Sequence, residues 1–369
     1  MIIYFIPFTI LTLLTSLENS NKLKLLIKNK YFFWTLSIPF IIFIGLRHEI
    51  GCDWNQYLMM FEKYDSVNLI EIIERNFFSD HKIQELGHVF LTTISKDIYM
   101  LNFLYSIIFV IPLFYFCSQI KRSYLALLIS FPYYIVVVGM GPIRQAACTS
   151  LLMLSIILIS RRKYYSHLFL TFTSLLIHQY SIIFNGLVLS PFLKNIKKIR
   201  FTKINIFIIF IILSIFLYNF PSLIHKTYHY FILYKKIGSI TGEMIIPPAK
   251  SAILIWLIHF LPSFIFLRNK FQFKFNNDLN NIFLTFSILE FLLFPVIFLN
   301  SVIAYRLLLY LFPSSIYISS HLVDIKLLNF KKSYITNILI SISLISLIIW
   351  LNFAFHASCW VPYKNILFI

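Results

Sequence analysis

Charged residues are scarce in this chain. Asp, Glu, Lys and Arg make up only 12% of its 369 residues, while 59% are hydrophobic and 18% are aromatic. Soluble domains carry about 25% charged residues. The composition therefore excludes an ordinary soluble fold and predicts an integral membrane protein.

Cysteine is also scarce, and its four positions do not suggest a metal site. Cys52, Cys117, Cys148 and Cys359 form no Cys-x-x-Cys pair and have no zinc-type spacing to histidine. Cys117 and Cys148 fall in apolar runs, where we expect them to pack as small side chains. An oxidising compartment would permit a bridge between Cys52 and Cys359, but we expect two free thiols.

The sequence lacks an internal repeat of 20 to 50 residues and any low-complexity tract. Its two halves do not resemble each other. This counts against transporter folds that are built from inverted repeats.

Long apolar runs dominate what is present. A membrane span needs about 20 apolar residues, and we predict about twelve spans in one all-α domain covering residues 1–369. They lie at 2–17, 31–46, 99–118, 124–138, 142–160, 164–178, 180–193, 203–221, 250–267, 279–299, 302–320 and 334–354. The run 2–17 lacks a basic start and a small-residue cleavage site, so we interpret it as a span and not a signal peptide.

The net charge of +18 is distributed in a way that suggests topology and not nucleic-acid binding. Most Lys and Arg occur in alternate loops, which the positive-inside rule places in the cytoplasm. These loops are 18–30, 119–123, 161–163, 194–203, 268–278 and 321–333. Both termini and the segments 47–98, 222–249 and 355–369 then face outward.

The outward segment 47–98 holds nine of the fourteen acidic residues. Apolar residues at helical spacing between them, such as Ile70, Ile73 and Phe77, predict amphipathic helices lying on the membrane or the bundle.

Three arginines fall on the predicted outward side: Arg47, Arg144 and Arg306. The Gly-Pro pair before Arg144 predicts a helix start, and a first-turn Arg beside free backbone N–H groups can bind an anion. Guanidinium groups bind phosphate through paired hydrogen bonds. The alternatives are snorkelling to lipid headgroups and, for Arg306, a buried pair with Glu290 or another acid.

Three residues on the same side are candidate general bases: His178, Asp53 and Glu85. His178 lies between two apolar stretches that are too long together for one span, so we predict a turn at His178-Gln179. Its ordinary pKa suits proton transfer. The alternative for His178 is a structural hydrogen bond. The alternatives for the two carboxylates are solvation and pairing with an arginine.

An ordered set of short motifs resembles the EpsG-like branch of the Wzy-type polysaccharide polymerases. In this chain the motifs read RHEIGCDWNQY, QELGHVF, IRQAA, HQYS, AYR and WVPY. Cys52 after Gly51, and Ala146-Ala147 after the Arg-Gln pair, depart from the usual residues at those places.

The resemblance implies a GT-C-like, metal-independent glycosyltransferase of the bacterial inner membrane without a cofactor. Such an enzyme joins undecaprenyl-diphosphate-linked oligosaccharides, one as donor and one as acceptor, on the periplasmic face. The product would be O-antigen, capsule or another polysaccharide, and a chain-length regulator would be a partner.

With this resemblance, the residues receive roles as expectations. Arg144 and Arg306, with Arg47 less firmly, would bind the diphosphate, and Asp53 or His178, with Glu85 as competitor, would be the base. Candidates to line the sugar cavity are Tyr57, Trp54, Gln145, Tyr305, Trp360 and Tyr363. Tyr and Trp also crowd membrane interfaces for other reasons.

Two other functions use the same lipid-linked sugar. A flippase would need polar residues along a path through both leaflets, whereas here they cluster on one side. An O-antigen ligase usually has its largest outward loop between late spans, whereas here it is the early one.

Overall fold

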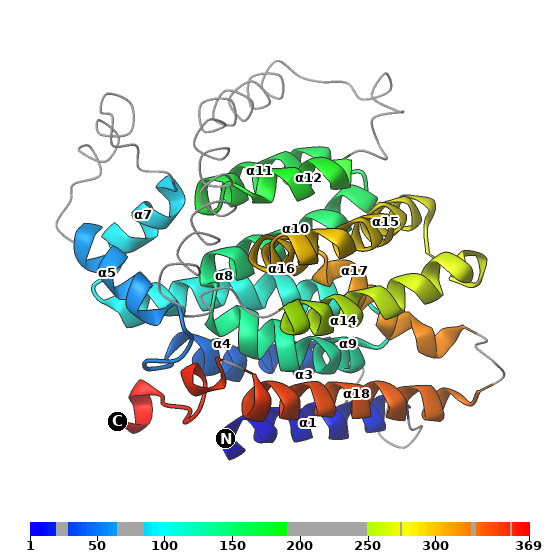
Figure 1. Cartoon of the computed structure of the whole chain (residues 1–369), viewed down its shortest axis with the longest axis horizontal. Coiled ribbons are helices and arrows are strands. Elements are labelled where there is room, and N and C mark those ends of the chain that lie inside the picture. The colour runs from blue at the N-terminus through cyan, green and yellow to red at the C-terminus, as the bar shows by residue number, and fades with distance from the viewer. Residues whose placement is uncertain (20–28, 65–84, 190–248, 274, 326–329, 355) are drawn as a thin grey trace. The chain divides into compact units, whose positions relative to one another are not determined.

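The computed structural model describes residues 1–19, 29–64, 85–189, 249–273, 275–325, 330–354 and 356–369. Every regular segment of these residues is a helix (Figure 1). The segment predicted to be amphipathic around Ile70 and Phe77, the span at 203–221 and all but the last residue of the loop 222–249 lie outside them. The all-α prediction is confirmed for the described part of the chain.

Four described helices are long and apolar enough to cross a membrane, and a bent pair of helices makes a fifth candidate. The four are α8 (Ile98–Ser118), α10 (Ile143–Ser160), α15 (Asn277–Leu299) and α18 (Lys332–Phe353). Shorter apolar helices match the predicted spans at 2–17, 31–46, 124–138 and 250–267. The count of about twelve spans stays a prediction.

The chain divides into two units, which we describe separately. The first contains Met1–Lys82, Gly87–Leu154 and Ile316–Ile369. Besides α8, the start of α10 and α18, its helices are α1 (Ile2–Asn19), α3 (Lys30–Thr35), α4 (Ser37–Gly45), α5 (Trp54–Tyr64), α7 (Leu86–Ile94) without its first residue, and α9 (Ser123–Ser130). A π-helix, Phe131–Val138, continues α9 where Pro132 has no N–H to donate.

The first unit has a polar group at each end of α18. At the Lys332 end, Asp324 pairs with Arg122 at 3.3 Å, with Lys332 at 3.5 Å and with Lys121 at 3.6 Å. At the other end the chain continues into the C-terminal tail, where Lys364 pairs with Glu49 at 2.7 Å. Because α18 has 22 residues, it is about 33 Å long. About one bilayer thickness therefore separates the basic cluster at the Lys332 end of the unit from the end that carries the loop after α4.

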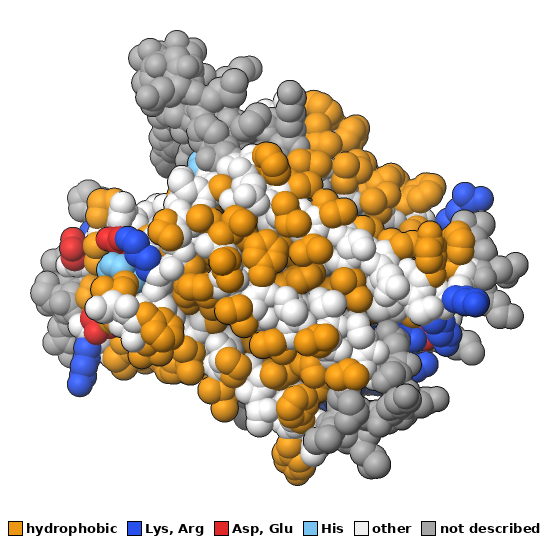
Figure 2. Space-filling model, turned by 90° about the horizontal axis from the view of Figure 1, so that it is seen from below, with side chains coloured by type: hydrophobic (Ala, Val, Ile, Leu, Met, Phe, Trp, Pro, Cys, Tyr) orange, Lys and Arg blue, Asp and Glu red, His pale blue; other side chains and the backbone are white. Residues whose placement is uncertain are grey.

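An apolar surface lies between those ends. The helices α1 and α18 lie side by side and expose Ile6, Ile10, Ile342 and Ile345. On the face seen in Figure 2, hydrophobic side chains cover the middle and charged ones gather at two opposite sides. This is the pattern that a lipid-facing surface requires.

The second unit contains Ile83–Leu86 and Ser155–Ser315. Besides α15 and the end of α10, its helices are α11 (Tyr164–Ile177), α12 (Ser181–Leu189), α14 (Ala249–Arg268), α16 (Ser301–Leu309) and the first turn of α17 (Phe312–His321). The predicted turn at His178-Gln179 is confirmed, because α11 ends at Ile177 and α12 begins at Ser181.

The predicted span 302–320 is not one straight helix. It consists of α16 and α17, which meet at an angle of 58°. Pro313 lies in the first turn of α17, a position where proline is tolerated but where it cannot continue the hydrogen bonding of a preceding helix. The apolar run is therefore a broken span.

Candidate functional site

Arg47 anchors the loop after α4. It is 1% exposed, and its guanidinium donates to the Ile44 carbonyl at 2.7 Å, to the Ile50 carbonyl at 3.1 Å and to Asn102 Oδ1 at 3.0 Å. Burial lowers the pKa of Arg47 to about 10, so the group remains a cation at neutral pH. Three of its five N–H donors are engaged inside the protein, which favours a structural role for Arg47 over diphosphate binding.

The C-terminal tail, residues 356–369, lies against the same loop. The backbone N–H of His48 donates to the Lys364 carbonyl at 3.0 Å, and that of Ile366 donates to the Leu46 carbonyl at 2.9 Å. Arg47 and Asn365 form an antiparallel β-bridge between these hydrogen bonds. The tail is therefore held to the loop by backbone hydrogen bonds around one isolated β-bridge.

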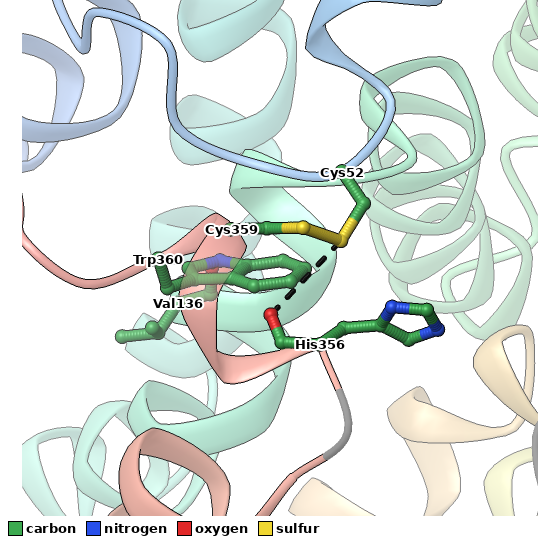
Figure 3. Close-up of a disulfide and its surroundings, with 5 residues drawn as sticks. All are labelled: Cys52, Val136, His356, Cys359 and Trp360. Carbon is green, nitrogen blue, oxygen red and sulfur yellow. Dashed lines mark hydrogen bonds between the residues drawn. A yellow bond between two sulfur atoms is a disulfide. The ribbon is translucent and has the colours of Figure 1, made fainter.

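A disulfide joins the loop to the tail. Cys52 and Cys359 are bonded although 307 positions separate them in sequence. Figure 3 shows the pair beside Trp360, whose indole N–H donates to the Val136 carbonyl at 2.9 Å. The expectation of two free thiols was wrong, because the folding of the tail onto the loop brings the two cysteines together. Cys117 and Cys148 are buried and are not part of a disulfide, in keeping with the expected packing role.

Gly51 brings the loop close to the start of α10. Its φ of +96° is a conformation that side chains disfavour, and a Cβ there would collide with the Met140 carbonyl. Its N–H donates to the Cys359 carbonyl at 2.8 Å. The loop after α4, the C-terminal tail and the turn before α10 are therefore in close contact at Gly51.

Tyr57 on α5 and Arg144 on α10 are in contact. The Arg144 guanidinium carbon lies 5.5 Å from the centre of the buried Tyr57 ring, and the two residues also hydrogen-bond. Arg144 is half-buried in the first turn of α10, as the Gly-Pro pair predicted. Burial raises the pKa of Tyr57, and the nearby cation opposes that rise. The pair holds a guanidinium at a helix start, where backbone N–H groups also favour an anion.

His88 lies beside Tyr57 and contacts Tyr105. Sequence analysis did not assign His88 or Tyr105 to the site. The His88 ring lies 6.0 Å from the Tyr57 ring, and its Nδ1 is 2.9 Å from the Tyr105 hydroxyl. Burial lowers the pKa of His88 to about 4, so it is neutral at physiological pH. The motif QELGHVF contains His88, but nothing in its spacing indicates a contact with Tyr57.

Asp53 lies just before α5 and is half-buried. Its carbonyl accepts the first helical hydrogen bond, from the Tyr57 N–H at 3.0 Å. Its charge acts on the Tyr57 phenol and raises the pKa of that phenol. Asp53 is thus near the Tyr57–Arg144 pair, at a helix start that suits a carboxylate.

Four other predicted cavity residues in the first unit pack inside the protein. Trp54 is 7% exposed and contacts His48 and Tyr99. Trp360 and Gln145 are also buried, and Tyr363 stacks on Phe43 with ring centres 4.9 Å apart and donates its hydroxyl to the Phe43 carbonyl at 2.7 Å. These contacts favour a packing role for Trp54, Trp360 and Tyr363.

Glu85 and His178 form a pair in the second unit. The Glu85 Oε1 lies 2.9 Å from the His178 Nδ1, and the two residues are 6% and 7% exposed. Sequence analysis considered Glu85 and His178 as competing general bases, whereas in the structure their side chains contact each other. A carboxylate that accepts from Nδ1 orients the imidazole and makes Nε2 its basic nitrogen.

Arg306 and Tyr305 are half-buried on α16. Arg306 lies in the last turn of that helix, where the helix dipole favours a cation, and directly before the break to α17. Glu290, the alternative partner, accepts a hydrogen bond from Ser314 Oγ at 2.7 Å instead. Among the ion pairs of the described residues, Arg306 and Glu290 are not joined.

Cys52, His356 and Cys359 are the described group of residues that lie close enough to hold a metal, with ligand atoms within 4.8 Å of one another. Two of these atoms are the sulfurs of the disulfide. Metal binding by cysteine requires thiolates, so the oxidised group does not fit a metal.

Comparison with known proteins gives a family and no close relative. No curated protein and no solved structure matches the chain. The model of the EpsG family matches residues 30–365, which is nearly the whole chain and includes the loop after α4, the start of α10, the Glu85–His178 pair and most of the tail. The chain therefore belongs to the EpsG family, whose members are membrane proteins of the polysaccharide polymerase type.

Proposed function

We propose that this protein polymerises oligosaccharide repeats carried on undecaprenyl diphosphate. The acceptor is the sugar end of one lipid-linked repeat, and the donor is a chain on a second lipid. The reaction takes place on the periplasmic face of a bacterial inner membrane and yields O-antigen, capsule or a related polysaccharide. A chain-length regulator is the expected protein partner.

The positions of the charges and the disulfide support this sidedness. Asp324, Lys121, Arg122 and Lys332 mark one end of the first unit, in loops that the positive-inside rule assigns to the cytoplasm. The Cys52–Cys359 disulfide lies beyond the other end of α18. Disulfides persist in oxidising compartments such as the periplasm, so both features favour the same orientation.

The observation that carries the proposal is the placement of Arg144. Its guanidinium lies over the Tyr57 ring in the first turn of α10, 5.5 Å from the ring centre. A cation here is opposed by the helix dipole, which is a cost unless an anion binds. A diphosphate leaving group supplies that anion, and the fixed positive charge stabilises it as it departs.

The second requirement of the reaction is a base. The acceptor hydroxyl oxygen forms a bond to the anomeric carbon, the bond from that carbon to the diphosphate oxygen breaks, and the hydroxyl proton must leave. We assign the proton to His178, with Glu85 holding the imidazole in the basic tautomer. Arg306 is the second candidate cation for the diphosphate.

A deletion strain with plasmid rescue tests the function. We expect the deletion to make surface saccharide with one repeat and no ladder on a gel, and the wild-type gene to restore the ladder. Arg144→Ala should fail to restore it at normal protein level. Arg268→Ala, which removes an exposed guanidinium at the end of α14, is the matched control and should restore the ladder fully.

Two outcomes would contradict the proposal. A complete loss of surface repeats in the deletion would indicate a flippase instead of a polymerase. An unchanged ladder with Arg144→Ala would remove the role of this arginine in the chemistry.

A further inference from the structure

A buried carboxyl lies inside the second unit, apart from the residues used above. Glu290 on α15 is 0% exposed. Its Oε1 accepts from Ser314 Oγ at 2.7 Å, and the Ser263 hydroxyl lies next to the same carboxyl. The indole N–H of Trp256 donates to the Glu290 backbone carbonyl at 2.7 Å. Three helices, α14, α15 and α17, thus present polar groups around one acid within an apolar sequence.

The side-chain hydrogen bonds within the described residues leave this cluster incomplete. Glu290 Oε2, Ser287 Oγ and His259 Nε2 are buried without a partner there. Ser287 precedes Glu290 by three residues, and His259 precedes Ser263 by four, so each pair shares a helix face. His259 Nδ1 contacts Ser315 Oγ at 2.6 Å, directly beside Ser314. Native proteins leave few buried polar atoms unsatisfied, and several in one place indicate a missing ligand.

Two prolines free backbone carbonyls in the helices that carry the cluster. Pro262 in α14 and Pro295 in α15 cannot donate to the carbonyls four residues earlier, those of Ile258 and Phe291. Each of these carbonyls is adjacent in sequence to a cluster residue, His259 or Glu290. The start of α17 follows the 58° break after α16. Broken membrane helices with freed carbonyls are places where proteins bind small cations.

We propose that Glu290 is the centre of an intramembrane binding site for a monovalent cation, either Na⁺ or the proton. An ionised carboxylate in an apolar interior is costly without a counter-charge, and in this cluster the nearest side-chain partners are neutral hydroxyls. One negative charge with hydroxyl and carbonyl oxygens matches one positive charge, and it falls short of the carboxylates that divalent ions usually require.

The site is tested on the purified full-length protein in lipid nanodiscs, without any activity assay. Dicyclohexylcarbodiimide reacts with protonated carboxyls in apolar surroundings, and mass spectrometry locates the label. We expect labelling of Glu290 in sodium-free buffer. If Na⁺ binds, NaCl should reduce the labelling several-fold and raise the melting temperature, whereas choline chloride at equal ionic strength should do neither. Labelling that NaCl does not change assigns the site to the proton.

Matched variants keep the test independent of folding defects. Ser314→Ala removes the hydroxyl that donates to Glu290, and Ser287→Ala removes a second small polar group. Both should weaken protection by Na⁺ or alter the labelling rate several-fold. Ser320→Ala removes a buried hydroxyl of the same helix that donates only to the Ile316 carbonyl and should change nothing. Absence of both Glu290 labelling and a sodium-specific rise in melting temperature would overturn the proposal.

Discussion

The Nδ1 of His178 lies 2.9 Å from the Oε1 of Glu85, and both side chains are buried. The two residues are 93 positions apart in sequence, and the helices α7 to α11 lie between them along the chain. A buried imidazole and carboxylate at this distance form an oriented pair, in which the carboxylate stabilises the imidazolium that results from proton transfer.

The pair predicts a non-additive loss of activity. His178→Ala should lower the polymerisation rate about 100-fold or more, because it removes the base. Glu85→Gln should cause a smaller loss, and the double variant should be no worse than His178→Ala alone, since the carboxylate acts through the imidazole. Rates measured with purified variants test this.

The control for this pair is His167→Ala. His167 is a second buried histidine, on α11, and its partner is Ser155. We expect its substitution to leave the rate unchanged at matched protein amount. Independent, multiplying losses from His178→Ala and Glu85→Gln would show that the two residues do not act together.

The contact of Tyr57 with Arg144 predicts an effect on donor binding. Tyr57→Ala should raise the KM for the lipid-linked donor about fivefold to thirtyfold, since a partly desolvated cation–π contact contributes about 1–2 kcal/mol. Tyr57→Phe keeps the aromatic ring, so its KM should lie between those of Tyr57→Ala and the wild type. Tyr31→Ala, which removes an 83% exposed tyrosine, should leave KM unchanged. An equal KM for Tyr57→Ala and wild type would contradict the contact's role.

The Cys52–Cys359 disulfide predicts a defined thiol count. Under denaturing, non-reducing conditions a maleimide-polyethylene glycol reagent should add to two cysteines, the buried Cys117 and Cys148. After reduction it should add to four. Cys52→Ser should lower the free energy of unfolding by about 2–4 kcal/mol, because the tail is then held to the loop by hydrogen bonds and the Lys364–Glu49 pair. Four reactive thiols before reduction would contradict the bridge.

Arg47 predicts a defect in stability. Arg47→Ala should lower the free energy of unfolding by on the order of 3 kcal/mol, because it leaves the buried acceptors at Ile44, Ile50 and Asn102 without donors. Arg47→Lys should rescue little, since an ammonium group does not reproduce the planar fork. Thermal unfolding in detergent measures both. A destabilised Arg47→Lys protein that retains normal donor KM would support the structural role over diphosphate binding.

Local pattern predicted those parts of the fold that depend on neighbouring residues. The apolar run around His178 is too long for one span, and the chain does turn there. The Gly-Pro pair before Arg144 does start a helix. In both cases the physical cause, span length or backbone geometry, acts within a few residues.

Features that depend on distant residues could not be predicted in the same way. The pairing of Cys52 with Cys359 follows from how the tail folds onto the loop, which no local pattern encodes. The same holds for the Glu85–His178 pair and for the carbonyl ligands of Arg47. The break before Pro313 was missed because the two helices taken together have the mean hydropathy of one span, so hydropathy does not mark where the helix breaks.

Reconstitution is the most direct measurement of the central claim, that this EpsG-family protein joins lipid-linked repeats. The purified protein in liposomes would receive single-repeat lipid extracted from the deletion strain, and products would be separated by mass spectrometry. We predict lipids that carry two or more repeats, with one free undecaprenyl diphosphate released for each bond formed, and product formation slowed about 100-fold or more with His178→Ala. If the folded wild-type protein leaves the single-repeat lipid unchanged and releases no lipid diphosphate, the polymerase assignment is wrong.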